Sequence, residues 1–80
     1  MPKLLVLNGW KSFFYSREGM PLEPPHVHIR KGGSEAKVRL TPVVRVADDR
    51  RMDPRTLKML VEVVGRHRDD FEERWHEFFS

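Results

Sequence analysis

The chain has no cysteine, which excludes both a disulfide framework and a thiolate zinc site. It also has no apolar run near the ~20 residues that a membrane-spanning helix needs. The N-terminal apolar stretch, residues 4–7, is too short for the core of a signal peptide. We therefore expect a cytoplasmic protein that does not associate with membranes. At 80 residues the chain has room for one small domain, residues 1–80.

A strong charge of one sign is missing as well, because 15 Lys and Arg residues are set against 12 Asp and Glu residues and leave a net charge of +3. The charge is unevenly spread, since residues 1–52 are basic on balance and residues 53–80 are acidic on balance. This asymmetry can steer an anionic partner towards the basic half, or it can draw the two halves of one domain together.

What the chain does have is the heptad Glu-Pro-Pro-His-Val-His-Ile at residues 23–29. Each proline fixes its own φ and biases the preceding residue towards extended conformations, so the heptad should lead directly into a strand. Side chains alternate along a strand, which puts His26 and His28 on one face, roughly 6–7 Å apart. Because the chain has only four histidines, this pair is its best candidate for chemistry.

Asn8-Gly9 predicts the first of two consecutive β-hairpins, because both central residues of a type I′ turn need positive φ. The expected cross-strand pairs are Leu7 with Trp10, Leu5 with Ser12, and Leu4 with Phe13. Both faces of this hairpin are apolar. If a helix covers only one of them, the other remains open to a small protein partner or to a second copy of the chain. The predicted partner-binding residues are Leu5, Leu7, Trp10 and Phe14.

Gly32-Gly33 predicts the second turn, between residues 26–31 and residues 34–40. The expected cross-strand pairs are Val27 with Val38, His28 with Lys37, His26 with Arg39, and Arg30 with Glu35. One face of this hairpin is therefore apolar and closes on the core, whereas the other combines the histidines with basic side chains. A basic strand face is typical of nucleic-acid or anion binding. The predicted binding residues are Arg30, Lys31, Lys37 and Arg39.

Asp53-Pro54 predicts the start of a helix, with a carboxylate N-cap followed by proline at the first helical position. Apolar residues then recur every three or four positions, and Gly65 is the expected bend in a helix over residues 53–79. We predict an α+β fold, with a small antiparallel sheet of two consecutive β-hairpins covered by a long or kinked C-terminal α-helix. The sheet should lie within residues 3–46, of which 43–46 form a short edge segment.

Three interpretations of the histidine pair remain open. Two imidazoles on one strand face present ligands to zinc or iron, provided that Glu23, His67 or His76 converges on them. Neighbouring cations oppose a divalent ion, so we expect no metal and no other cofactor, although any metal site would use His26 and His28. Alternatively, the two histidines are catalytic, acting as base and acid in phosphodiester cleavage while the cations stabilise the transition state. In the third interpretation they are structural and hydrogen-bond to backbone or carboxylate groups.

Several segments besides the heptad carry a family resemblance. They are Phe14-Tyr15-Ser16, Ala36-Lys37-Val38, Leu40-Thr41-Pro42-Val43 and Trp75-His76-Glu77-Phe78-Phe79. With these segments the chain resembles, over nearly all of its length, the small prokaryotic proteins of the domain-of-unknown-function family 4160. The resemblance implies a gene that is often encoded beside another small protein, in some cases as a suspected toxin–antitoxin component, and it transfers no catalytic residue. Asp48-Asp49-Arg50-Arg51 departs from the family pattern, which usually has small residues or Asn and Gly at the joint before the helix.

We therefore expect a small cytoplasmic bacterial interaction module, a component of a toxin–antitoxin-like two-gene system, with a protein partner and with nucleic acid as a second expected partner. The alternative is a histidine-dependent phosphodiesterase, ribonuclease or metal-binding enzyme that uses His26 and His28. The stability of a variant in which one of the two histidines is replaced with Ala helps to distinguish these interpretations. An exposed polar residue contributes little stability, whereas a buried, hydrogen-bonded histidine contributes more.

Overall fold

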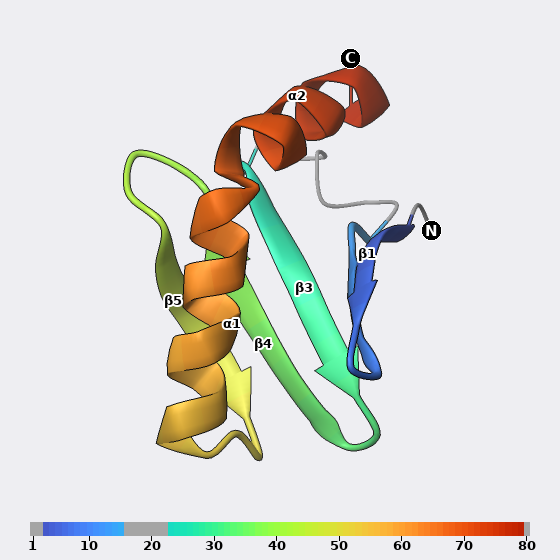
Figure 1. Ribbon diagram of the computed structural model, residues 1–80. Helices are drawn as coiled ribbons and strands as arrows, with labels where there is room; N and C mark the ends of the chain where they lie inside the picture. Colours follow the sequence, from blue (N-terminus) through green and yellow to red (C-terminus); the bar gives the residue numbers. More distant parts are fainter. Residues whose placement is uncertain (1–2, 16–22, 80) are drawn as a thin grey trace.

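The computed structural model describes residues 3–15 and 23–79, which form five strands and two helices. The strands pair antiparallel in the order β1-β2-β3-β4-β5, and both helices follow the sheet in the chain (Figure 1). The elements are β1 (Lys3–Leu7), β2 (Trp10–Phe13), β3 (His26–Lys31), β4 (Ser34–Arg39), β5 (Arg45–Arg50), α1 (Pro54–Arg66) and α2 (Arg68–Phe79). The predicted α+β class is confirmed. Within the described residues, no helix combines the length and apolar character needed to cross a bilayer.

The two predicted turns join the strands at the expected positions. Asn8 and Gly9 have φ values of 48° and 83°, as a type I′ turn requires. All four pairs predicted between β3 and β4 occur. In the first hairpin the predicted pair of Leu4 with Phe13 is wrong, because an irregularity in β1 places Lys3 opposite Phe13 instead.

The sheet extends further along the chain than predicted, because β5 runs from Arg45 to Arg50 rather than ending at residue 46. Asp48 and Asp49 disfavour a strand by intrinsic propensity, yet both pair with residues of β4. The β4–β5 register is irregular between Val46 and Asp48, where β5 has one extra residue, and regular pairing continues beyond it. Charged side chains are common on edge strands, where they discourage uncontrolled pairing. Arg51, with a φ of 55°, follows the end of the strand.

The helical segment is broken into two helices rather than bent at Gly65. Asp53 is the N-cap of α1 and Pro54 follows it, as predicted. The Asp53 carboxylate accepts hydrogen bonds from the Thr56 backbone N–H at 2.9 Å and from the Thr56 hydroxyl at 2.7 Å. Gly65 lies inside α1, and the break falls two residues later, at His67. α1 covers one face of the sheet, whereas α2 turns across its end, beside the start of β3 (Figure 1).

The core lies between the helices and the covered face of the sheet. Its strand residues come mainly from the apolar sides of β3 and β4, and its helix residues recur at the three- and four-residue spacing of an amphipathic helix. The buried members are Phe14, Val27, Ile29, Ala36, Val38, Leu40, Leu60, Val64, Phe71 and Trp75.

The apolar patch expected on the first hairpin is not open. Phe14 is fully buried, and its ring meets Trp75 edge-on with 5.3 Å between the ring centroids. Leu5 and Trp10 are partly buried and pack against the core. Of the four predicted residues, Leu7 alone is classed as exposed, at 37%. The expectation of a four-residue open patch is therefore wrong, because the covered face extends across β1 and β2 and α2 reaches Phe14.

Candidate functional site

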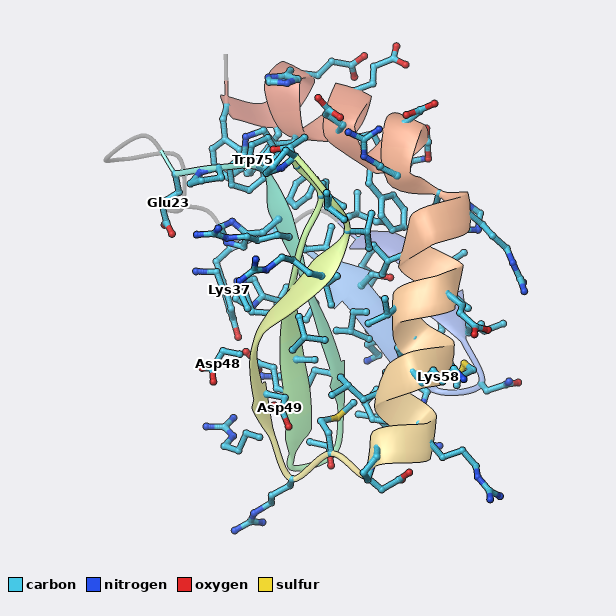
Figure 2. All side chains as sticks on the ribbon, turned by 90° about the vertical axis from the view of Figure 1, so that its left-hand side faces the viewer. Glu23, Lys37, Asp48, Asp49, Lys58 and Trp75 are labelled. Atoms are coloured by element: carbon cyan, nitrogen blue, oxygen red, sulfur yellow. The ribbon has the colours of Figure 1, made fainter. Side chains whose placement is uncertain are left out.

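The face of the sheet opposite α1 carries mostly polar side chains, and we call it the open face. Figure 2 shows Glu23, Lys37 and Asp48 projecting on this side, whereas Lys58 lies on α1 on the other side. Strand alternation and the observed register assign the strand residues of the open face. They are Lys3, Val6, Lys11, Phe13, His26, His28, Arg30, Glu35, Lys37, Arg39, Arg45, Asp48 and Arg50.

Positive charge dominates the open face, and part of it is placed where it costs stability. Lys11 stands directly opposite Arg30 across β2 and β3, and Arg39 stands directly opposite Arg45 across β4 and β5. Like charges at directly opposite positions destabilise a sheet. A bound anion would remove this repulsion, so the two pairs favour an anion-binding surface.

The described carboxylates of the open face have partners other than these four cations. Asp48 accepts a hydrogen bond from the Asp49 backbone N–H at 2.9 Å. Glu23 accepts a hydrogen bond from the Lys37 ammonium at 3.3 Å. The two carboxylate oxygens of Glu35 accept hydrogen bonds from the Tyr15 hydroxyl at 3.2 and 3.3 Å. The Glu35 carboxylate also lies 4.0 Å from the guanidinium of Arg50. Within residues 3–15 and 23–79, no carboxylate forms an ion pair with the cations of the two opposed pairs.

His26 lies beneath the open face rather than on its surface, since it is only 1% exposed. Its Nδ1 is 2.9 Å from the Pro24 carbonyl oxygen. A carbonyl can only accept, so this contact requires the proton on Nδ1. The ring also packs against Trp75 of α2, with 4.9 Å between the ring centroids. Pro24, in the double proline before the strand, thus supplies the carbonyl that accepts from His26, and Trp75 of α2 covers the imidazole ring.

His28 is buried beside it, at 7% exposure. Its Nδ1 lies 3.4 Å from a carboxylate oxygen of Glu35. Its ring lies 4.4 Å from that of Tyr15 and 5.9 Å from that of Phe13, measured between centroids. Tyr15, Glu35 and the two histidines therefore form one packed polar cluster below the basic side chains. Such a cluster can fix the positions of its neighbours, but it offers little imidazole surface to a substrate.

The structure does not bring the other predicted metal ligands to the histidine pair. Glu23 binds Lys37, as described above. His67 stacks on Phe71 with 5.5 Å between ring centroids, and His76 lies on α2, 3.8 Å from Glu72. Among the residues that the structure describes, no three His, Cys, Asp or Glu side chains are grouped so that they could hold a metal ion.

A family model described as a domain of unknown function, DUF4160, matches residues 9–76. The chain belongs to the DUF4160 family. No curated protein and no solved structure matches it. The matched range contains β2 to β5 and α1, so the strand residues of the open face other than Lys3 and Val6 lie within the DUF4160 domain.

The structure changes the set of predicted anion-binding residues in this DUF4160 domain. Arg30, Lys37 and Arg39 lie on the open face, but Lys31 lies on the opposite side, where its ammonium donates to the Asn8 carbonyl at 3.2 Å. Side chains alternate along a strand, so Lys31 points to the face opposite that of Arg30 although it lies at the hairpin tip.

Sequence reasoning also missed basic residues on the open face. Lys11 could have been found by continuing the alternation from β3 into β2. Arg45 and Arg50 depend on the extent of β5, for which the sequence gives only a weak signal.

Proposed function

We propose that this protein is a small interaction module that binds a nucleic-acid strand on the open face of its sheet. The observation that carries the proposal is the pair of directly opposed cations at Arg39 and Arg45, repeated at Lys11 and Arg30. A backbone phosphate bound between two such cations would offset part of their repulsion, and its binding would release counterions into solution. The two-gene, toxin–antitoxin-like setting and its protein partner stay predictions from the family resemblance.

The arrangement supports contacts with backbone phosphates more than with bases. Phe13 is only 5% exposed, so its face is not available as a stacking platform. The basic side chains project from several neighbouring strands and can follow a flexible strand across the sheet. We therefore expect binding with weak sequence preference and strong salt dependence, with a slope of log K against log salt of about −0.7 for each phosphate contacted.

The test is fluorescence anisotropy with a labelled single-stranded RNA, compared between two matched variants. Arg45→Gln removes an exposed arginine from the open face, and Arg55→Gln removes an exposed arginine from α1. We expect Arg45→Gln to weaken binding and to reduce the salt slope by about one phosphate contact, whereas Arg55→Gln changes neither. Equal effects of both variants would mean that net charge alone governs binding, and the proposal would fail. A duplex that binds as tightly as the single strand would instead argue for recognition of the double helix.

The histidine-dependent enzyme stays an untested alternative. The burial of His26 and His28 does not favour it, because a general acid or base must come within hydrogen-bond reach of its substrate. The same samples, separated on a denaturing gel after incubation, show whether the RNA is cleaved. Cleavage that His28→Ala removes and His76→Ala retains would support the enzyme instead.

A further inference from the structure

One end of the open face contains a hollow, and the ionisable side chains among the described residues that line it are basic. It is lined by Lys3 of β1, Lys11 and Phe13 of β2, and Arg30 of β3. The irregularity in β1 is what places Lys3 opposite Phe13, beside the opposed pair of Lys11 and Arg30. Glu35 stands across from Arg30 on β4, but its carboxylate is held by Tyr15 and lies beside His28. Three positive charges therefore converge on one hollow, and none of the described residues that line it is a carboxylate.

The Phe13 ring forms the floor of this hollow and is packed among other rings. The Phe13 ring packs edge-on against Tyr15, with 5.0 Å between centroids, and it stacks on His28. The guanidinium carbon of Arg30 lies 5.9 Å above the centroid of the same ring. A cation over an aromatic face is attracted to it, so Phe13 restricts the positions that the guanidinium can take. The buried cluster of Tyr15, Glu35 and the two histidines therefore helps to position Arg30, because Tyr15 and His28 pack against the Phe13 ring that lies under its guanidinium.

We infer that this hollow binds a terminal phosphate monoester of the nucleic-acid strand, an inference that rests on the proposed function. Arg30 can donate two parallel hydrogen bonds to phosphate oxygens, and the two lysines add point charges. A phosphate monoester carries about −1.5 to −2 charges at pH 7, whereas an internal phosphodiester carries one. Three cations line the hollow, and the Glu35 carboxylate across from Arg30 is held by Tyr15, so the described lining favours the monoester. The hollow also lies towards the β1 edge of the sheet, where a strand that crosses from β5 would end.

The first test is an NMR titration of the wild-type protein with inorganic phosphate, against sodium chloride at equal ionic strength. We expect phosphate to shift the backbone amides of Lys11, Ser12 and Arg30 and to leave those of α1 unchanged. An equal response to chloride would overturn the inference.

The second test compares 5′-phosphorylated and 5′-hydroxyl RNA of one sequence by fluorescence anisotropy. We expect the wild type to prefer the phosphorylated strand by about tenfold, the size of one charge-assisted contact. Lys11→Gln and Arg30→Gln should each reduce this preference, whereas the matched controls Lys58→Gln and Arg55→Gln should retain it. All four residues are exposed, so the variants should fold, and circular dichroism verifies this.

The outcomes separate the inference from the proposed function. RNA binding with no preference for the phosphorylated end, or with a preference that survives both substitutions, would overturn the inference and leave the proposed function standing. Specific amide shifts with inorganic phosphate but no binding of RNA would overturn the proposed function and retain a phosphate site.

Discussion

Replacing His28 with Ala should destabilise the fold rather than remove a surface group. The imidazole is 7% exposed and is enclosed by the rings of Phe13, Tyr15 and His26. Its Nδ1 is 3.4 Å from the Glu35 carboxylate. The substitution therefore leaves a cavity under the open face and removes a polar neighbour of a largely buried carboxylate.

The magnitude follows from these two effects. Truncating a buried side chain of this size costs about 2–4 kcal/mol, and the loss of a polar contact to the carboxylate adds about 1 kcal/mol. Glu35 keeps its hydrogen bonds from Tyr15, so we expect a total near the lower end, about 3 kcal/mol. A domain of this size typically has about 4–12 kcal/mol of stability in all. The corresponding fall in Tm is roughly 12–24 °C.

Urea denaturation and thermal unfolding, followed by circular dichroism, measure this loss. His76→Ala is the matched control, because the His76 side chain is 66% exposed and its substitution should change stability by less than about 0.5 kcal/mol. The structural interpretation also requires that wild-type zinc binding be absent. If His28→Ala unfolds with the wild-type midpoint, the imidazole is not packed as described, and the reasoning is refuted.

The remaining predictions concern the helix, its cap and the first hairpin. Gly65→Ala should raise the free energy of unfolding by about 0.5–1 kcal/mol, because Gly65 lies inside α1 and an added Cβ meets open space; a lower free energy would mean that the glycine is needed for the break. The hydrogen bonds from the Thr56 hydroxyl and then from its backbone N–H hold the pKa of the Asp53 carboxyl below its ordinary value of 3.8. A depressed carboxyl pKa contributes stability that is present above 3.8 and is lost as pH falls through the folded-state value. Asp53→Asn should therefore flatten the acid limb of stability measured by urea denaturation from about pH 5 to pH 2, and an unchanged acid limb would contradict this. Leu5→Lys should lower the urea midpoint clearly while Leu7→Lys leaves it nearly unchanged, and equal tolerance would show that Leu5 is not packed on the core.

Local signals in the sequence were sufficient for much of the fold. The glycine-containing turns at residues 8–9 and 32–33 determine which residues pair next to each turn, because a two-residue turn sets the register there; farther along β1 the irregularity changes it. The N-cap at Asp53 acts within one turn of helix, so neighbouring residues alone could specify it. These features were predictable because each depends on residues close together in the chain.

Features that depend on distant residues were not predictable in the same way. The extent of β5 is determined by pairing with β4, against the low strand propensity of Asp48 and Asp49. The break at His67 lies where α2 turns across the end of the sheet, and no glycine or proline occupies that position. Similarly, Phe14 is buried against residues of α2 that are distant in the chain, among them Trp75, sixty-one residues later.

For the candidate site, the sequence by itself determined that His26, His28, Arg30, Lys37 and Arg39 share a surface of the sheet, since side chains alternate along a strand and the Gly32-Gly33 turn fixes their register. Only the tertiary structure decided which of them are covered. Trp75 of α2 packs on His26, and Tyr15 packs on His28, so the histidines form the floor of the site while the cations remain above it. The physical reason is that alternation sets the direction of a side chain, whereas burial depends on what the rest of the chain places against it.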